Sequence, residues 1–292
     1  MLRGLKKFIN TRLNIFSSEK VLSNKLFNFF GCQVLRILIY NFIVFFKRKF
    51  FFSGKYYSGI TSQVNEIKNK GFLIFNNFLS DEEFEEAKIY FNKEVEKISS
   101  FTNDKYEKKF SISGMTIDRE NIQNIKNPWY KIFLKKKELG RIIEVLVAKK
   151  ISSMKDSSFY FEKLHRSGKK ENLPNDPQNI FHRDTFYCSL KFIFLMDDVS
   201  SENGPFSYVE GSNKISKWKM EKEFLGSLKN EKNLRDEKLK FNEKKIKVFC
   251  QKKNTLILFD SSGFHKRLPT EINYERNTIR FTSREHPFSL SI

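Results

Sequence analysis

The second half of the chain consists largely of short apolar runs separated by polar turns. These runs cover residues 157–164, 179–196, 206–209, 246–250, 255–260 and 276–284. Phe, Ile, Leu and Val dominate them, while Asn, Gly, Pro and Ser bound them, a combination typical of β-strands. We therefore predict that the chain is mainly β from about residue 157 onward.

The first half of the chain has the patterns of helices. Ser80 is followed by three acidic residues, and a hydroxyl cap with an acidic first turn predicts a helix over 80–99. A second helix is predicted over 127–150, with Gly140 as an interruption. A short strand is predicted over 72–75. The predicted fold class is therefore mainly β with flanking helices.

Residues 1–60 form a basic, Phe-rich segment that we separate from a main domain over 61–292. The segment contains eleven Lys or Arg residues and a single acid. Its stretch 26–46 has the length of a membrane span, but polar residues interrupt it at Asn28, Gln33, Arg36 and Asn41. Three placements stay open: helices packed against the main domain, peripheral attachment to an anionic membrane surface, and a true span.

The net charge of +20 is unevenly distributed. Outside 1–60 the basic excess is concentrated in 217–253, which holds thirteen basic and six acidic residues. We interpret 217–245 as a charged insertion, either a solvated helix or a lid over a site. No nucleic-acid motif accompanies these charges, so we predict no specific nucleic-acid partner. Lys and Arg interleaved with Phe nevertheless leave a general nucleic-acid-binding or membrane-binding protein as an alternative.

The cysteines bear on the compartment in which the protein works. Cys32, Cys188 and Cys250 are scattered along the chain and form no C-x-x-C pair. An odd number of scattered cysteines indicates a reducing compartment and argues against a Cys-based zinc site. The predicted localisation is cytoplasmic, with membrane association as the alternative that residues 1–60 leave open.

Two of the four histidines fall into a metal-binding pattern. Residues i and i+2 of a strand face the same side, so His182 and Asp184 can reach one metal while Arg183 points away, in a salt bridge or at a cleft edge. With His265 they make the two-histidine, one-carboxylate set that binds Fe(II) and leaves positions open for a co-substrate and O2. The same set also holds Zn(II), so a zinc hydrolase is an alternative.

Other polar residues have weaker roles. Arg276 follows His265 by eleven residues, and its planar guanidinium suits a carboxylate-bearing co-substrate. Arg280 shares the same strand face and is the alternative for that role. His165 lies beside a loop and is a candidate substrate contact, whereas His286, just before a proline, is interpreted as structural or exposed.

The order of these motifs resembles the phytanoyl-CoA dioxygenase family of Fe(II)/2-oxoglutarate-dependent oxygenases. The H-x-D of the family matches His182 and Asp184, its distal histidine matches His265, and its 2-oxoglutarate arginine matches Arg276. Its E-N-G-P turn matches 202–205. A strand followed by a helix over 71–84 looks like the start of the family domain, so the resemblance covers about residues 65–288.

The chain departs from the family pattern at loop positions. Glu210 stands where the family often has proline, Asn213 where it often has histidine, and 254–255 where Gly-Asp is common. The separation of 81 residues between Asp184 and His265 is long for the family, and the insertion accounts for it.

The resemblance implies a fold and a reaction. The fold is a double-stranded β-helix, the jelly-roll-like barrel of the cupins, with which the late β pattern is compatible. Fe(II) is expected on His182, Asp184 and His265, with 2-oxoglutarate chelating the iron and pairing with Arg276, and with O2 as oxidant. The expected reaction is hydroxylation of a small organic substrate with release of succinate and CO2. Net positive charge favours an anionic substrate. A non-catalytic cupin-like metal or ligand-binding protein is the alternative.

Overall fold

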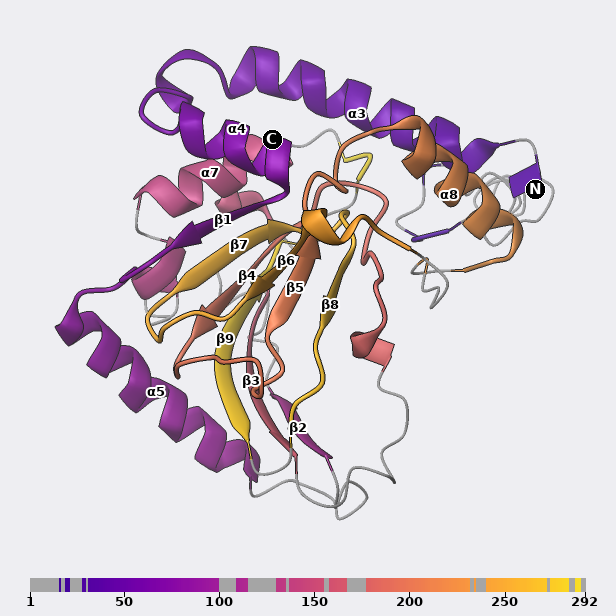
Figure 1. Cartoon of the computed structure of the whole chain (residues 1–292). Coiled ribbons are helices and arrows are strands. Elements are labelled where there is room, and N and C mark those ends of the chain that lie inside the picture. The colour runs from indigo at the N-terminus through magenta and orange to yellow at the C-terminus, as the bar shows by residue number, and fades with distance from the viewer. Residues whose placement is uncertain are drawn as a thin grey trace, which may run out of the picture.

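The computed structural model describes most of the chain. The described residues are 16, 19–21, 28–29, 31–99, 109–114, 130–134, 137–154, 158–166, 177–231, 234, 240–271, 274–283 and 287–289. Within them, antiparallel sheets form the centre and helices lie around them (Figure 1). The prediction of a mainly β core with flanking helices is therefore confirmed.

Two antiparallel sheets carry the site. The larger has six strands in the order β1-β7-β4-β9-β3-β2, and the smaller has three in the order β6-β5-β8. The larger sheet comprises β1 (Phe72–Phe75), β2 (Lys109–Gly114), β3 (Ser158–Arg166), β4 (Leu190–Leu195), β7 (Leu256–Asp260) and β9 (Glu275–Thr282). The smaller sheet comprises β5 (Phe206–Val209), β6 (Ile246–Phe249) and β8 (His265–Arg267).

Helices precede and interrupt the strands. The α-helices are α3 (Cys32–Phe51), α4 (Thr61–Lys70), α5 (Asp81–Ser99), α7 (Lys137–Val147) and α8 (Lys217–Leu228). Shorter helical turns are η2 (Gly54–Tyr56), a π-helical η4 (Tyr130–Leu134), η5 (Ile151–Ser153), η7 (Pro177–Asn179) and η8 (Glu243–Lys245). The predicted helix over 80–99 agrees with α5. Ser80 caps it, because its Oγ accepts from Glu83 N while the Glu83 carboxylate accepts from Ser80 N.

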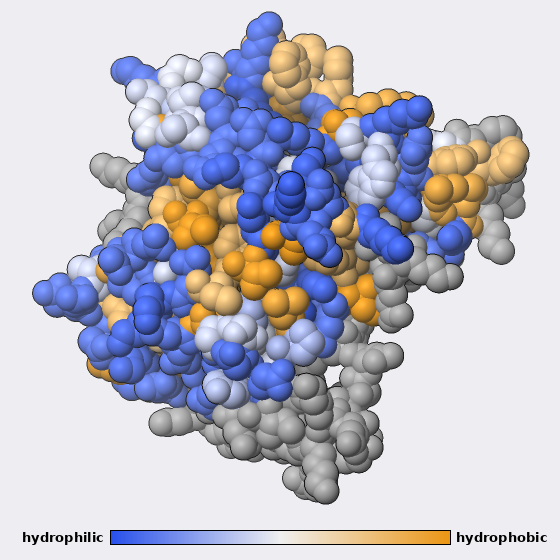
Figure 2. Space-filling model, in the orientation of Figure 1, coloured by the Kyte–Doolittle hydropathy of each residue, from blue (hydrophilic) through white to orange (hydrophobic). Residues whose placement is uncertain are grey.

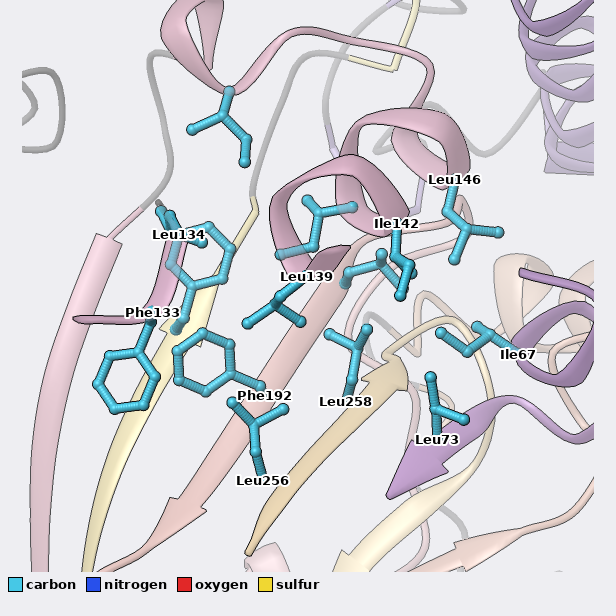
Figure 3. Packing of buried hydrophobic residues seen from close by; sticks show 14 of the residues in the cluster. Ile67, Leu73, Phe133, Leu134, Leu139, Ile142, Leu146, Phe192, Leu256 and Leu258 are labelled. Atoms are coloured by element: carbon cyan, nitrogen blue, oxygen red, sulfur yellow. The ribbon is translucent and has the colours of Figure 1, made fainter. Parts of the chain in front are cut away.

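Alternate side chains of the larger sheet enter two different apolar clusters. On β4, Phe192 and Phe194 join the cluster shared with the helices, whereas Ile193 and Leu195 join a cluster shared with the smaller sheet. The period of two along a strand produces this division. Figure 3 shows Phe133, Leu139 and Ile142 from the helical layer close to side chains of the strands. The main core therefore lies between the sheet and the helices, which leaves the other sheet face for the site.

Helix α3 packs against the main domain. Ile37, Tyr40 and Val44 are buried and belong to the same apolar cluster as the strands. Of the three placements for the N-terminal segment, packing against the domain therefore holds for α3. Among the described residues, no helix combines the length and the apolar character that crossing a membrane requires.

Two predictions of secondary structure are wrong. Gly140 does not interrupt a helix but lies inside α7, where a Cβ would come within 2.8 Å of the Leu134 carbonyl oxygen, so glycine allows this close packing. The strand predicted over 179–196 is regular only at β4. Before β4 the backbone makes one isolated bridge, at His182, and then turns, because Asp184 N and Ser189 O bond to Ser261 rather than to successive ladder positions.

The region predicted as a charged insertion contains one α-helix, α8 over Lys217–Leu228, and this helix is not solvated all round. Lys219, Glu223 and Ser227 of α8 are buried, since this face packs against α3 and the loops of the smaller sheet. The rest of the insertion includes 232–233 and 235–239, which lie outside the described residues. Helix α8 is thus part of the structural support beside the site (Figure 1).

We expect Phe133→Ala to lower the free energy of unfolding by about 3–5 kcal/mol, because it opens a cavity in a core that relaxes only partly. Phe133 is fully buried and its ring lies against Phe78, Phe159, Phe192 and Phe194. Urea titration followed by circular dichroism measures the change. The matched control is Ile89→Ala on the exposed side of α5, and a loss as small as that of the control would contradict the packing described.

Candidate metal centre

Backbone pairing brings the two histidines of the predicted site together. His182 N donates to His265 O at 3.0 Å, and His265 N donates to His182 O at 2.9 Å. This isolated antiparallel bridge joins the segment before β4 to the start of β8. The two imidazole rings consequently lie with their centroids 4.7 Å apart.

Asp184 completes a compact group with the two histidines. Its Oδ2 lies 3.4 Å from His265 Nε2, and its Oδ1 lies 3.9 Å from His182 Nε2. One ligand atom from each of the three residues lies within 4.8 Å of the others, and all three residues are buried. Ligand atoms at right angles around an ion about 2.1 Å away would be separated by roughly 3 Å, so small side-chain rotations suffice for coordination.

The ring nitrogens are oriented for binding a cation. His182 Nδ1 lies 2.8 Å from Ile180 O, and His265 Nδ1 lies 2.9 Å from Gly263 O. A carbonyl oxygen only accepts, so each Nδ1 carries a proton, and Nε2 is the nitrogen that can offer a lone pair to a metal. A backbone carbonyl behind a metal-binding imidazole also fixes the ring orientation. The donor set therefore fits a divalent transition metal.

Lys191 of β4 contacts the carboxylate of Asp184. Its Nζ lies 2.5 Å from Oδ2, the oxygen that also faces His265, while Oδ1 faces His182. Burial opposes ionisation of Asp184, but Lys191 and the two histidines outweigh it and hold the pKa of the carboxyl well below its usual range. Asp184 is therefore an anion at neutral pH, as ligation requires.

Arg183 points away from the triad, as predicted, and forms a buried ion pair. Its guanidinium bonds to the Glu223 carboxylate of α8, and both side chains are fully buried. Gln33 Nε2 of α3 donates to the same carboxylate at 3.2 Å, and Arg36 Nη1 donates to Gln33 Oε1 at 2.9 Å. Through these bonds, α8 and α3 fix the position of Arg183, which lies between His182 and Asp184 in the sequence.

Close packing fixes the turn that precedes His265. A Cβ on Gly263 would lie 1.8 Å from the Tyr208 hydroxyl, so a side chain has no space there. Tyr208 donates to Asp260 O at 2.9 Å, and its ring stacks on that of His265 at 6.4 Å between centroids. Lys219 of α8 donates to Ser262 O in the same turn at 2.9 Å. These contacts set the position of the Gly263 carbonyl that orients the His265 ring.

Three arginines surround a buried carboxylate next to the triad. Glu162 Oε1 of β3 lies 2.7 Å from Arg276 Nη2 and 2.5 Å from Arg280 Nη2, while its Oε2 lies 3.9 Å from Arg267 Nη1. Arg267 and His265 are two residues apart on β8, which spaces their Cα atoms by about 7 Å. Burial opposes ionisation of Glu162, but Arg280, Arg276 and Arg267 lower its pKa to about 2.

Arg276 lies deepest in this cluster. It is 1% exposed, and burial lowers its pKa to about 10 although Glu162 opposes that shift. Its Nη1 donates to Gly204 O, within the E-N-G-P turn, and its Nη2 to Glu162. Its Nε is buried and has no hydrogen-bond partner among the described residues. A buried donor without a partner calls for an explanation, and an anionic ligand would supply one.

The structure thus brings together His182, Asp184 and His265 and places Arg276 and Arg280 in one cluster. The side chain of His165 and the whole of His286 lie outside the described residues. The sequence analysis missed Glu162, Lys191 and Glu223. For Lys191 the signal was visible, since it is the single charged residue in an otherwise apolar run. Glu223 gave no signal, because it is one of many charges in the insertion.

Comparison with known proteins gives a family and a set of structural similarities. Residues 67–269 match the sequence profile of the family described as Phytanoyl-CoA dioxygenase (PhyH). No curated protein sequence matches the chain. The match to the profile extends over most of the chain and includes all three members of the triad.

Solved structures are similar at low sequence identity. AviO1 from Streptomyces viridochromogenes Tue57 is 12% identical with a TM-score of 0.46, over 77% of this chain and 94% of that one. HygX from Streptomyces hygroscopicus, with nickel and 2-oxoglutarate bound, is 15% identical with a TM-score of 0.45, over 76% and 85%. The non-heme alpha ketoglutarate dependent epimerase SnoN from nogalamycin biosynthesis is 10% identical with a TM-score of 0.46, over 77% and 82%.

We expect the stabilising effect of Glu162 to disappear in acid. Its folded pKa of about 2 lies below the ordinary 4.5, so the unfolded chain binds the proton first as pH falls. The stabilisation is complete above about pH 5 and is lost progressively as pH falls toward 2, by roughly 3 kcal/mol. The measurement is the difference in unfolding free energy between the wild type and Glu162→Gln across this pH range. The contributions of the other acids are the same in both proteins and cancel in the difference. A difference that does not change with pH would contradict the stabilisation of ionised Glu162 by the three arginines.

We expect Glu223→Gln to lower the free energy of unfolding by about 3–5 kcal/mol, because it leaves Arg183 buried without a counter-charge. Thermal and urea unfolding measure the loss. Glu221→Gln is the matched control, since Glu221 lies on the same helix but is exposed. Equal effects of the two substitutions would show that the buried pair does not support the segment of His182 and Asp184.

Proposed function

We propose that this chain, which belongs to the phytanoyl-CoA dioxygenase family, binds Fe(II) through His182, Asp184 and His265 and oxidises a small organic substrate with 2-oxoglutarate and O2. The observation that supports it most is the convergence of the three buried ligand atoms within 4.8 Å, with both Nε2 atoms available. Iron with 2-oxoglutarate and O2 supplies an oxidising centre that hydroxylates a C–H bond and releases succinate and CO2.

The protein side chains prepare the site for that chemistry. The carbonyls of Ile180 and Gly263 lie within hydrogen-bond distance of the two Nδ1 atoms and fix the orientation of both rings. Lys191 keeps Asp184 ionised, with its two oxygens facing His265 and His182. These three residues would hold the iron, which would then supply the chemistry with the co-substrate and O2.

Arg276 is proposed to bind the far carboxylate of 2-oxoglutarate. Its Nε is a buried donor without a partner among the described residues, and its guanidinium is held in place by Gly204 and Glu162. The arginine cluster has three cations and one carboxylate, so it can accept a second carboxylate and still keep a positive charge. Arg280, on the same strand as Arg276, also contacts Glu162 and adds to the positive potential around Arg276.

The same charges favour an anionic substrate. Lys191 and the three arginines exceed Asp184 and Glu162 by two positive charges. Fe(II) and the 2-oxoglutarate dianion cancel each other, so this excess persists in the loaded site. A positive, partly buried site attracts and retains a negatively charged small molecule.

The proposal extends to the fold. The larger and smaller sheets share an apolar cluster and carry the triad at their junction, an arrangement that supports the cupin-like double-stranded β-helix expected for the family. On this proposal residues 61–292 form the catalytic domain and 217–245 form an insertion. Glu223 of the insertion binds Arg183, between His182 and Asp184, and Lys219 binds the turn before His265.

Succinate formation tests the proposed function. We expect the wild type, with Fe(II) and with ascorbate as the reductant in place of the unidentified substrate, to convert 2-oxoglutarate and O2 to succinate and CO2, and Asp184→Ala to form none. Arg276→Gln should raise the half-saturating 2-oxoglutarate concentration about 10- to 100-fold, because a hydrogen bond to a charged group contributes roughly 1.5–3 kcal/mol. Mass spectrometry of succinate provides the readout.

Arg280→Gln is the matched control for Arg276. A larger effect of Arg280→Gln than of Arg276→Gln would transfer the anion role to Arg280. Absence of succinate from a folded protein that retains iron would reject the dioxygenase and favour the metal-binding protein.

A further inference from the structure

Helix α3 presents an apolar face to solvent. Leu35, Leu38, Phe42, Phe45 and Phe46 are all exposed, and Phe42 reaches 64%. Steps of three, four, three and one residues place them on one side of a helix. Figure 2 shows hydrophobic side chains at the upper edge of the molecule, where α3 lies in Figure 1. A continuous apolar stripe of this kind marks an interaction surface.

The opposite face of α3 carries two polar residues beside the buried Ile37 and Val44. Gln33 and Arg36 are fully buried, and Arg36 Nη1 donates to Gln33 Oε1 at 2.9 Å. Tyr40 is buried as well, and its hydroxyl donates to Cys188 O at 3.2 Å. A helix at the surface of a water-soluble domain usually has its polar side outward, whereas α3 exposes large apolar side chains. The exposed face of α3 therefore has the composition of a face that meets an apolar medium.

Basic residues border the C-terminal end of this face. Lys49 and Lys55 are exposed, and Lys49 also lines a hollow of about 490 Å³. Aromatic and basic side chains line the hollow, among them Phe45, Phe52, Tyr57, Arg48, Lys49 and Lys68. No acidic residue is among the described residues that line it. Apolar contacts beside several cations suit an amphiphile with an anionic head.

We propose that the outer face of α3 docks onto the surface of an anionic phospholipid bilayer. The apolar stripe would enter the boundary between headgroups and acyl chains, while Lys49, Lys55 and Lys68 contact lipid phosphates. The eleven basic residues and one acid of segment 1–60 add attraction to such a surface. The helix lies on the bilayer rather than across it, in keeping with the lack of a spanning helix among the described residues.

The charges favour a lipid surface over a second copy of the chain. Two copies joined through this face would bring the basic borders of both copies into one interface, and the hollow offers no acid as a partner among its described lining residues. An anionic bilayer supplies the missing counter-charge. The proposal concerns α3 alone and does not depend on the metal chemistry.

Vesicle flotation of the full chain tests the proposal. We expect the wild type to float with vesicles of phosphatidylcholine mixed with phosphatidylglycerol and much less with phosphatidylcholine alone. Raising NaCl from about 0.1 M to about 1 M should weaken binding, because the Debye length falls from ~10 Å to ~3 Å. Phe42→Ser/Phe45→Ser should lower partitioning by about tenfold or more, since two large apolar side chains no longer enter the boundary. Lys49→Glu/Lys55→Glu should remove the preference for anionic vesicles.

The control is Ile89→Ser/Val248→Ser, which changes two exposed hydrophobics on α5 and β6 and should bind as the wild type does. Circular dichroism verifies that each variant is folded. The proposal is overturned if the wild type binds neither vesicle, or if the α3 variant binds like the control. It is also overturned if light scattering shows a dimer that Phe42→Ser/Phe45→Ser converts to a monomer without any vesicle binding, because a second copy then covers the face.

Discussion

The candidate site depends on one pair of backbone hydrogen bonds, those between His182 and His265. They join a segment before β4 to the first residue of β8, which is 83 positions later in the numbering, and they place both imidazoles over one point. The surrounding contacts stabilise this bridge. Lys191 of β4 forms an ion pair with Asp184, and the carbonyls of Ile180 and Gly263 fix the orientation of the two imidazole rings. The packing of Tyr208 against Gly263 fixes the turn that leads into β8.

Buried charge is the second constraint, and the fold balances it in two separate groups. Outside the site, Glu223 binds both Arg183 and Gln33, and Gln33 accepts from Arg36. Helix α3 and the insertion therefore stabilise the segment of His182 and Asp184 together. On the side of the sheet that faces the site, three arginines share Glu162 and keep an excess of positive charge. Neither group is stable without its acid, because an unpaired buried charge costs several kcal/mol. On the proposed function, the first group supports the metal-ligand segment and the second receives the far carboxylate of 2-oxoglutarate.

Much of the site was predictable because its residues are rare and regularly spaced. His182 and Asp184 are two residues apart, and only His265 combined an apolar neighbourhood with an arginine eleven positions later. The ends of β1 and β5 were predictable from the polar turns that bound their apolar runs, and the start of α5 from the Ser80 cap. The irregular backbone over 180–189 was not, since its apolar composition favours a strand and only the long-range bonds to Ser261 and His265 break it. Glu162 and Glu223 were also beyond local patterns, because each acquires its role from arginines distant in sequence.

The most direct test of the central claim is the visible spectrum of the anaerobic protein after addition of Fe(II) and 2-oxoglutarate. We predict a charge-transfer band of the iron-bound co-substrate in the wild type and no band in His182→Ala, with Ile89→Ala as a folded control that keeps it. The band requires no knowledge of the substrate. A folded wild type that binds Fe(II) yet develops no band would contradict the dioxygenase site and leave a zinc centre or a metal-binding protein as the better account of the same three ligands.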